Sequence, residues 1–305
     1  MKVFMTGGSG FVGTFLSREL VREGHAVTIL SRRERRPDPA FSAVGYITGD
    51  PTQEGPWMAA APEHDWIINL AGASVFTRWT AAAKRELYES RILTTQNLVK
   101  ALSRGDRRQL FCSTSAIGYY GNREDEELTE DSPPGDDFLA RLAVEWEAEA
   151  LKAQDLGIRT VVTRFGLVLG RGGGVLSQMA PLFRKFLGGP LGSGRQWFSW
   201  IHQRDHGRAF LFVKDHPEIS GPVNFTAPHP VRNRDLAQAL GRALHRPAFM
   251  PAPAFMIRLV LGEFGQVILE GQKVLPKKLL NGGFEFLYPT IDKALEDLLG
   301  GIRNE

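Results

Sequence analysis

The amino-acid sequence predicts an α/β protein with a doubly wound parallel sheet and a smaller, mainly helical C-terminal lobe. Three features predict this class: a glycine-rich turn directly after the first apolar run, a regular alternation of strand and helix patterns, and a change to glycine- and aromatic-rich sequence after Gly170. Repeated alternation of strands and helices implies a parallel sheet that is covered by helices on both faces. A chain of 305 residues is long enough for one such domain and a smaller lobe.

The first strand–helix–strand unit spans about 30 residues, the size of one βαβ crossover. Residues 3–5 form a short apolar run that ends in glycines, as expected of a buried parallel strand. Apolar residues then recur at helical spacing from Val12 to Leu20, and Gly24 occupies the position of a C-terminal helix glycine. Residues 26–30 are therefore expected to form the second strand.

The same alternation continues along the chain and sets the predicted domain boundaries. A later segment, 222–225, is predicted to return to the sheet as a strand, and the tail from 250 to 299 holds two or three helical patterns. Further strands are expected at 66–71, 109–113 and 159–163, and helices at 81–102 and 137–154. The larger domain is assigned to residues 1–170, with 197–228 returning to it, and the smaller, substrate-side lobe to 171–196 and 229–305.

Charge and composition narrow the range of partners. A net charge of +3 without a dense basic face argues against nucleic-acid and membrane partners, and no apolar run approaches the ~20 residues of a membrane span. The single cysteine, Cys112, excludes an internal disulfide and a cysteine zinc site, and its apolar surroundings predict a small buried side chain. The N-terminus has no signal-peptide pattern, so we expect a cytoplasmic protein, or one in an organelle matrix. It is expected to act on a small-molecule substrate as a monomer or a homodimer.

The glycines of the first turn predict a dinucleotide site. Gly7, Gly10 and Gly13 form the pattern G-x-x-G-x-x-G directly after a strand and at the start of an amphipathic helix. Glycines allow a tight turn and a close approach to a pyrophosphate, whose charge is stabilised by the free N–H groups of the helix N-terminus. The strand–turn–helix context favours a Rossmann-type domain over a purely structural glycine turn.

The end of the second strand indicates which nucleotide is bound. An NAD site has an acidic residue there for the ribose 2′-hydroxyl, whereas this chain has Ser31, Arg32 and Arg33 before its next carboxylate, Glu34. A guanidinium can bind the 2′-phosphate of NADP in a bidentate manner. We therefore expect NADP(H), with Arg32 on the 2′-phosphate. The alternative is a solvated basic loop that continues through Arg36.

Further motifs accompany the glycine turn: the strand ends 69–72 and 113–116, the pair Tyr120-Gly121, and Trp-Ile-His-x-x-Asp at 200–205. Together they resemble the extended short-chain dehydrogenase/reductase superfamily, the branch of nucleotide-sugar epimerases and dehydratases. A more specific resemblance, to an atypical "epimerase family" group with a small characteristic C-terminal domain, covers essentially the whole chain. The segments that carry it are 69–72, 78–80, 90–92, 115–121, 146–147, 194–202, 221–224 and the tail from 261 to 284.

The resemblance implies a set of cofactor-binding residues in the glycine turn and at the ends of neighbouring strands. They are Gly7, Gly10, Phe11, Val12, Gly13, Arg32, Asn69, Ala71 and Gly72. No metal site is implied.

The superfamily's chemistry uses a tyrosine four residues before a lysine on one helix, where the lysine lowers the pKa of the tyrosine and the tyrosine moves a proton. None of the five tyrosines of this chain has a lysine four residues later, and the two positions fall near Leu139 and Ala143. The dyad is absent. Ser115 stands at the position of the superfamily's catalytic serine, and Tyr119 and Tyr120 could supply a phenol. All three are catalytic candidates, against a structural serine and a packed aromatic pair.

Residues nearby carry weaker expectations. His202 is expected to be a hydrogen-bonded core residue, Asp205 to cap a helix at 207–214, and Glu147 to be a solvated helix carboxylate next to a core tryptophan, Trp146. Four aromatic residues are expected either to line a flat substrate pocket between the lobes or to form interface core. They are Trp79, Trp197, Phe198 and Trp200.

Two functions are therefore consistent with the sequence. The first is an NADP(H)-dependent oxidoreductase or epimerase-like enzyme that acts on a small carbonyl or hydroxyl substrate, with Ser115 and a nearby tyrosine polarising the substrate oxygen. The second is a protein that senses or carries NADP(H) without turnover, as the missing dyad suggests. The fold alone does not choose between them.

Overall fold

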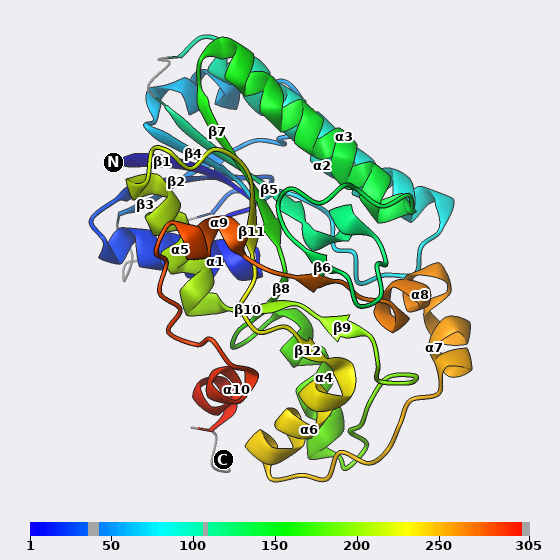
Figure 1. Cartoon of the computed structure of the whole chain (residues 1–305). Helices are drawn as coiled ribbons and strands as arrows, with labels where there is room; N and C mark the ends of the chain where they lie inside the picture. Colours follow the sequence, from blue (N-terminus) through cyan, green and yellow to red (C-terminus); the bar gives the residue numbers. More distant parts are fainter. Residues whose placement is uncertain (36–42, 106–108, 301–305) are drawn as a thin grey trace.

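A computed structural model of the chain describes residues 1–35, 43–105 and 109–300. At its centre lies a seven-stranded sheet with the order β11-β7-β5-β4-β1-β2-β3, in which every neighbouring pair is parallel (Figure 1). The strand order reverses beside β1, so the predicted doubly wound fold is confirmed. The strands are β1 (Lys2–Thr6), β2 (Ala26–Ser31), β3 (Val44–Thr48), β4 (Trp66–Asn69), β5 (Leu110–Ala116), β7 (Arg159–Phe165) and β11 (Gly221–Phe225).

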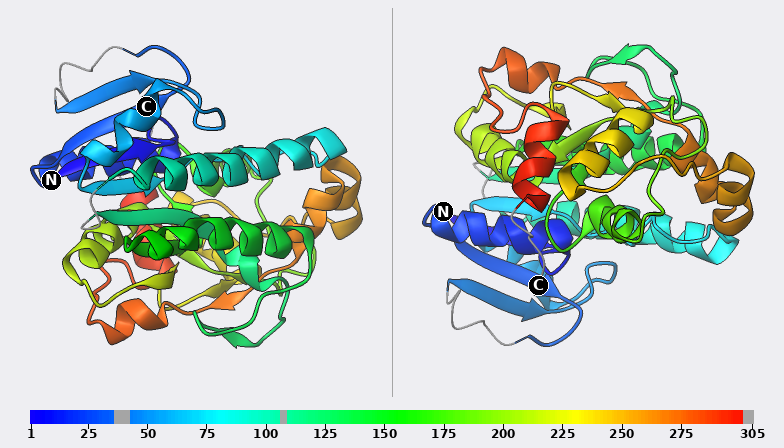
Figure 2. Two further views of the ribbon diagram at one scale, coloured as in Figure 1. Left: turned by 90° about the horizontal axis from the view of Figure 1, so that it is seen from above. Right: turned by 90° about the horizontal axis from the view of Figure 1, so that it is seen from below.

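Helices cover both faces of this sheet (Figures 1 and 2). On one face lie α1 (Phe11–Arg22) and α5 (Gln203–Asp215), which share a hydrophobic core with the strands. On the other face lie α2 (Ala81–Leu102) and α3 (Phe138–Leu151), over a second core. The apolar strand residues are buried on both sides, as a parallel sheet requires.

The predicted elements of the sheet are largely confirmed. The helix predicted at 81–102 has these bounds, and the segment predicted to return to the sheet pairs with β7 as its edge strand β11. The helix predicted to end at residue 154 ends at Leu151 and continues as a 3₁₀ turn, η5 (Lys152–Leu156). Strand β3 was not predicted, because an edge strand that buries only part of its surface carries a weak apolar pattern.

Outside the seven-stranded sheet, the chain forms a region of short paired strands and short helices. Its strand pairs are β8 (Leu167–Leu169) with β10 (Trp200–His202), β9 (Trp197–Phe198) with β12 (Val231–Arg232), and β6 (Glu127–Leu128) with β13 (Lys273–Val274). Its helices are α4 (Gly174–Arg184), α6 (Asn233–Leu244), α7 (Ala254–Leu261), α8 (Glu263–Leu269), α9 (Lys277–Asn281) and α10 (Ile291–Leu299). The tail therefore holds four helices where two or three were predicted. Helices α6 and α10 pack together around a separate core that includes Trp200.

The expected burial of Cys112 is confirmed. Cys112 is fully buried in β5, where the Trp66 indole N–H donates to its sulfur over 3.3 Å and burial raises the pKa of the thiol to about 12. No helix in the described ranges combines the length and the apolarity needed to span a membrane.

Candidate cofactor and active site

The glycine turn between β1 and α1 has two crowded glycines and one open glycine. Gly7 has a φ of +66°, and a Cβ atom there would lie 2.5 Å from the carbonyl of Leu70. A Cβ atom on Gly13 would lie 2.4 Å from the Gly7 oxygen. At Gly10 the single close neighbour is the Gly7 oxygen at 3.3 Å, so the space outside Gly10 is open. Gly7 and Gly13 thus allow the turn to pack, whereas Gly10 leaves room beside it.

The N-terminus of α1 has no protein group that neutralises it within the described structure. Its N-cap is Gly10, which has no side chain to accept from the first N–H groups, and its first turn contains no acidic residue. The N–H groups of the residues that follow, Phe11 and Val12, therefore keep their partial positive charge. Such a terminus is suited to bind a phosphate.

Phe11 is covered by the glycine-rich segment that follows β8. A Cβ atom on Gly173 would lie 2.3 Å from the Phe11 ring, and one on Gly170 would lie 2.7 Å from it. The glycines after Gly170 therefore let a loop of the smaller lobe pack directly on the first turn of α1.

Asn69, at the end of β4, is fully buried and holds three strands together. Its Oδ1 atom accepts from the Thr6 hydroxyl at 2.7 Å, and its Nδ2 atom donates to Thr95 Oγ1 at 3.0 Å and Ser113 Oγ at 3.2 Å. The amide N–H of Ala71 lies 3.4 Å from Oδ1. Asn69 thus fixes the strand end beside the glycine turn.

Arg91 supports the next residues, and its role was missed in the sequence. A Cβ atom on Gly72 would lie 3.1 Å from its guanidinium carbon, which sits 5.2 Å from the centre of the Trp146 ring. The guanidinium donates to the carbonyls of Leu87 and Ala73, each at 3.0 Å. Burial lowers the pKa of Arg91 to about 10. In the sequence, the motif Ser-Arg-Ile at 90–92 was the signal that could have pointed to Arg91.

Arg32 follows the end of β2 and is exposed, with no partner in the part of the chain that the structure describes. The hydroxyl of Ser31 turns the backbone there, because it donates to the Arg33 carbonyl at 2.8 Å. Arg36, the other end of the expected basic loop, lies outside the described residues. A free guanidinium therefore stands at the strand end where a nucleotide ribose would be recognised.

The ends of β5 and β7 meet in a buried network of charged and polar side chains. Arg164 forms a bidentate ion pair with Glu147, with Nε–Oε1 and Nη2–Oε2 distances of 2.8 and 2.7 Å. The Ser115 hydroxyl donates to Glu147 Oε1 at 2.6 Å. Arg164 also donates to the Tyr120 hydroxyl at 2.9 Å, and this hydroxyl donates to Asn224 Oδ1 at 2.7 Å. The network links β5, α3, β7 and β11.

The network is closed to solvent and electrically balanced. The side chains of Arg164 and Glu147 are 2% and 5% exposed, so Glu147 is not the solvated carboxylate that its helix pattern predicted. Burial opposes the charge of Arg164, but hydrogen bonds and charge from Glu147 outweigh it, and the pKa of Arg164 lies above its ordinary value. Burial raises the pKa of Tyr120 to about 12, with partial opposition from Arg164. The helix pattern was misleading because it does not show that Arg164 pairs with Glu147.

A second carboxylate, Glu130, extends this buried region and was missed. Its Oε1 atom accepts from the backbone N–H groups of Asn224 at 3.0 Å and Lys278 at 3.2 Å. It thus joins the loop after Tyr120 to β11 and to the start of α9. A carboxylate in an acidic loop gives no sequence signal for such burial.

The helix face where the dyad would stand is apolar. Leu139 and Ala143 lie one turn apart on α3, and Glu147 follows one turn later. The Leu139 side chain packs on η4 (Ile117–Tyr120), 3.3 Å from the Cβ position of Gly118. No ionisable side chain therefore replaces the missing tyrosine or lysine at these two positions.

Tyr119 differs from its neighbour in the network. Its ring is half-buried and lies against the Arg164 guanidinium, whose carbon is 3.5 Å from the ring centre. Within the described structure its hydroxyl has no hydrogen-bond partner, whereas that of Tyr120 has two. Of the three catalytic candidates, Tyr119 alone keeps a free polar group.

The expectation that Asp205 caps the following helix is wrong. The cap of α5 is His202, whose Nδ1 atom accepts from the Arg204 N–H at 3.1 Å. The Asp205 carboxylate instead accepts from the backbone N–H groups of Leu287 and Tyr288, at 2.9 and 2.8 Å, and so attaches the C-terminal tail. The helix begins earlier than predicted, which places Asp205 inside its first turn. As expected, His202 is a buried, hydrogen-bonded residue.

The four aromatic residues do not gather in one pocket. Trp79 packs with Phe138 and Phe264 in a core between α3 and α8. Phe198 and Trp200 belong to the core of the smaller lobe. Trp197 stays half-buried beside Arg232. Three of the four rings are therefore core residues rather than the lining of one pocket.

The fold and the site define a class: a Rossmann-type protein of the dehydrogenase and epimerase kind, with an intact nucleotide turn and without the tyrosine–lysine dyad. The chain belongs to the NAD dependent epimerase/dehydratase family, whose profile matches residues 3–225. A second profile, a domain of unknown function termed DUF1731, matches residues 252–298, the C-terminal helices. The predicted resemblance is thereby confirmed.

Relatives match over nearly the whole chain. The Bacillus subtilis epimerase family protein YfhF is 39% identical over 309 residues, which cover 98% of each chain. The chloroplastic SDR39U1 homolog of Arabidopsis thaliana is 39% identical over 302 residues, covering 98% of this chain and 87% of that protein. The crystal structure of human epimerase family protein SDR39U1 with NADPH matches with a TM-score of 0.88 and 36% identity, over 99% of this chain and 100% of that chain.

Proposed function

We propose that this protein binds NADP(H) at the glycine turn and acts as an oxidoreductase or epimerase-like enzyme on a small carbonyl or hydroxyl substrate. The observation that carries the cofactor assignment is the uncapped N-terminus of α1 beside the open space at Gly10, with the free guanidinium of Arg32 at the end of β2. The human relative solved with NADPH supports this choice of nucleotide.

The residues present fit such a cofactor. The backbone N–H groups of Phe11 and Val12 would bind the pyrophosphate, and Arg32 would bind the 2′-phosphate. Asn69, with its hydrogen bonds to Thr6 and Thr95, would hold Ala71 and Gly72 along the nucleotide. When bound, the nicotinamide would supply or accept a hydride.

The protein's own groups suggest how a substrate oxygen is handled. The Ser115 hydroxyl donates its hydrogen bond to Glu147. Its oxygen can therefore accept a hydrogen bond from a substrate hydroxyl, but it has no hydrogen left to donate to a carbonyl. Tyr120 is buried and doubly hydrogen-bonded. Tyr119 has the free phenol, and we assign to it the proton transfer at the substrate oxygen. Ser115 and Tyr120 then position the neighbouring groups. The smaller lobe, 171–196 and 229–305, would supply the substrate side.

One observation favours the alternative of a protein that binds NADP(H) without turnover. The dyad positions are occupied by Leu139 and Ala143, and the hydroxyls of Ser115 and Tyr120 are both engaged inside the protein. General acid–base assistance is worth about 10²–10⁴-fold, and without Tyr119 the described site has no evident source for it.

The experiment that separates the two functions follows NADPH in the presence of the purified protein. We expect saturable NADPH binding, and loss of NADPH fluorescence when a metabolite extract is added but not in its absence. On the substrate purified from the extract, Tyr119→Phe should lower kcat more than it raises KM, the mark of an interaction made chiefly in the transition state. Tyr120→Phe is the matched control and should act mainly on stability.

Other outcomes would contradict parts of this proposal. Tight NADPH binding with neither NADPH consumption nor a new product in any extract fraction would favour the sensor or carrier, because an epimerase returns the hydride and consumes no NADPH. Unchanged kcat in Tyr119→Phe would remove Tyr119 from the chemistry. Robust epimerisation of ordinary nucleotide sugars by the unmodified protein would show that the dyad is replaced by groups not identified above.

A further inference from the structure

A hollow of about 370 Å³ in the smaller lobe is lined by three arginines, Arg195, Arg232 and Arg234. Arg195 precedes β9, Arg232 lies in β12, and Arg234 lies in the first turn of α6. The antiparallel pairing of β9 with β12 brings these segments together. Like charges repel, so three guanidiniums around one hollow need a reason.

The loop before β9 fixes the arrangement. Gly192 and Gly194 have φ values of +56° and +66°, and the Gly194 carbonyl accepts from the Arg234 N–H at 2.9 Å. A Cβ atom on Gly194 would lie 2.9 Å from the Arg234 Cβ atom. The loop therefore places Arg195 and Arg234 on adjacent, closely packed backbone.

Beside the hollow, two donors converge on one carboxylate oxygen. The Trp197 indole N–H donates to Asp125 Oδ1 at 2.8 Å, and the Arg232 guanidinium, which lies 4.0 Å from the Trp197 ring centre, donates to the same atom. The Trp197 hydrogen bond and then that from Arg232 lower the pKa of Asp125. Asp125 belongs to the loop after Tyr120, and its side chain is 73% exposed. One of the three arginines that line the hollow is therefore already paired with an exposed carboxylate.

Asp125 does not balance the charge of the hollow. Within the described structure the Arg195 side chain has no partner, and Arg234 has only Asp235, at an Nε–Oδ1 distance of 3.7 Å. Three guanidiniums thus face two carboxylates, and one of these comes from an exposed loop. A positive excess remains, and it grows if Asp125 leaves.

We propose that this hollow binds the phosphate group of a ligand, and that the phosphate competes with the Asp125 carboxylate for Arg232. Guanidiniums match a phosphate with paired, charge-assisted hydrogen bonds. The phosphate is either a free anion or the phosphate end of the substrate. The site is separate from the glycine turn and does not require NADP(H) to bind.

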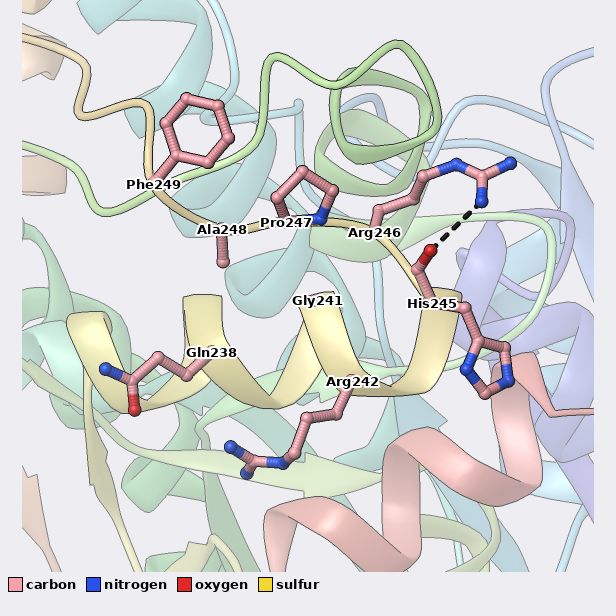
Figure 3. A pocket seen from close by; sticks show the side chains of 8 residues that line it. All are labelled: Gln238, Gly241, Arg242, His245, Arg246, Pro247, Ala248 and Phe249. Atoms are coloured by element: carbon pink, nitrogen blue, oxygen red, sulfur yellow. Dashed lines mark hydrogen bonds between the residues drawn. The ribbon is translucent and has the colours of Figure 1, made fainter.

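A second hollow, at the other end of α6, supplies a control. It is larger, about 840 Å³, and is lined by Gln238, Gly241, Arg242 and residues 245–249 (Figure 3). Its guanidiniums do not converge: Arg242 pairs with Asp292 at 2.6 Å, and Arg246 donates to the His245 carbonyl (Figure 3). Arg242 is therefore a surface arginine on the same helix, outside the proposed site.

The test is calorimetric titration of the full chain with inorganic pyrophosphate at constant ionic strength, with NADPH present throughout. We expect saturable binding that is weakened at least about tenfold in Arg195→Glu, the loss of one charge-assisted contact. Asp125→Asn should bind several-fold more tightly, because the competing carboxylate is gone. Arg242→Glu makes the same charge change on the surface and should alter the affinity less than about twofold.

The source of the phosphate is resolved by two further titrations. Tighter binding of a sugar phosphate than of inorganic phosphate would assign the site to the phosphate end of a substrate, and equal affinity would assign it to the free anion; either supports the proposal. The proposal is overturned by absence of saturable pyrophosphate binding, by equal weakening in Arg195→Glu and Arg242→Glu, or by no gain in Asp125→Asn. Failure of NADPH to bind would overturn the proposed function without touching this result.

Discussion

The glycine turn and the Ser115–Glu147–Arg164–Tyr120 network lie at the same edge of one sheet, yet they are built in opposite ways. The turn is made of backbone, and in the described structure the N–H groups of Phe11 and Val12 and the Arg32 guanidinium have no protein partners. The network is made of side chains whose polar groups satisfy one another. The first arrangement is open to a ligand, whereas the second stabilises the fold. At the border of the network, Tyr119 has a hydroxyl without a hydrogen-bond partner among the residues that the structure describes.

The largest effect is expected when one charged side chain of the buried network is removed. Glu147→Leu leaves Arg164 buried without its anion, and we expect the free energy of unfolding to fall by about 3–5 kcal/mol. Arg164→Met should cost a similar amount, because it leaves Glu147 unpaired. The measurement is urea denaturation at neutral pH.

The double variant Glu147→Leu/Arg164→Met is the control for this prediction. Removing both charges removes the uncompensated ion, so the double variant should be clearly more stable than either single one. Additive losses would mean that the two side chains contribute independently, and the network would then not be a unit.

At the turn, the expected effect is on binding and hardly on folding. Gly10→Val should raise the Kd for NADPH by about 100-fold or more, since the side chain would fill the space that a pyrophosphate approaches. Its cost to stability should be roughly 1 kcal/mol, because the extended conformation of Gly10 suits valine. Thermal shift with and without NADPH measures both quantities.

Gly13→Val is the matched variant in the same turn. Its Cβ atom would lie 2.4 Å from the Gly7 oxygen, so it should destabilise the protein itself. Normal NADPH stabilisation of Gly10→Val would show that the nucleotide lies elsewhere.

The free energy of unfolding should also depend on pH, through the buried histidine His206. Beneath the end of β7, His206 is fully buried among Phe165, Phe210 and Phe225, and burial lowers its pKa to about 3. In the unfolded chain the His206 imidazole is protonated below about pH 6.5, whereas in the folded chain it is protonated only below about pH 3. The stability that depends on His206 should therefore be intact above pH 6.5 and fall by up to about 1.4 kcal/mol per pH unit below it.

Denaturation curves at pH 7.5 and at pH 5 or so test this linkage. In His206→Phe the slope below pH 6.5 should be shallower. Part of the remainder belongs to His202, whose pKa burial lowers to about 4, and to His25 and His64, whose pKa values burial also lowers. His229→Gln changes an exposed histidine and should leave the slope as it is. A slope that is the same in all three proteins would rule out His206 as its source.

The smallest expected effect concerns the choice of nucleotide. Arg32→Glu should weaken NADP(H) by more than about 1 kcal/mol and leave NAD(H) nearly unchanged, since only the 2′-phosphate contact is lost. Parallel titrations with NADPH and NADH measure it. Equal affinity of the unmodified protein for the two nucleotides would refute the role of Arg32.

The parts of the protein that depend on local sequence could be predicted. The doubly wound sheet followed from apolar runs alternating with helical spacing, and the glycine turn from three glycines between a strand and a helix. Gly7 illustrates why: its positive φ and its contact with the Leu70 carbonyl are properties that only glycine allows. A backbone requirement of this kind restricts residue type and is visible in one short segment.

The tertiary structure decided the rest, because the groups concerned are far apart in the chain. The sequence pattern of Glu147 is that of a surface carboxylate on a helix, and only the fold places Arg164 of β7 beside it. Asp205 likewise has the pattern of a helix cap, and only the fold brings the tail at Leu287 to it. Whether Tyr119 or Tyr120 has a free hydroxyl depends on Asn224, about a hundred residues later. A polar side chain has the same identity in a buried pair as at the surface, so its role is fixed by its partners, and these are chosen only when the sheet assembles.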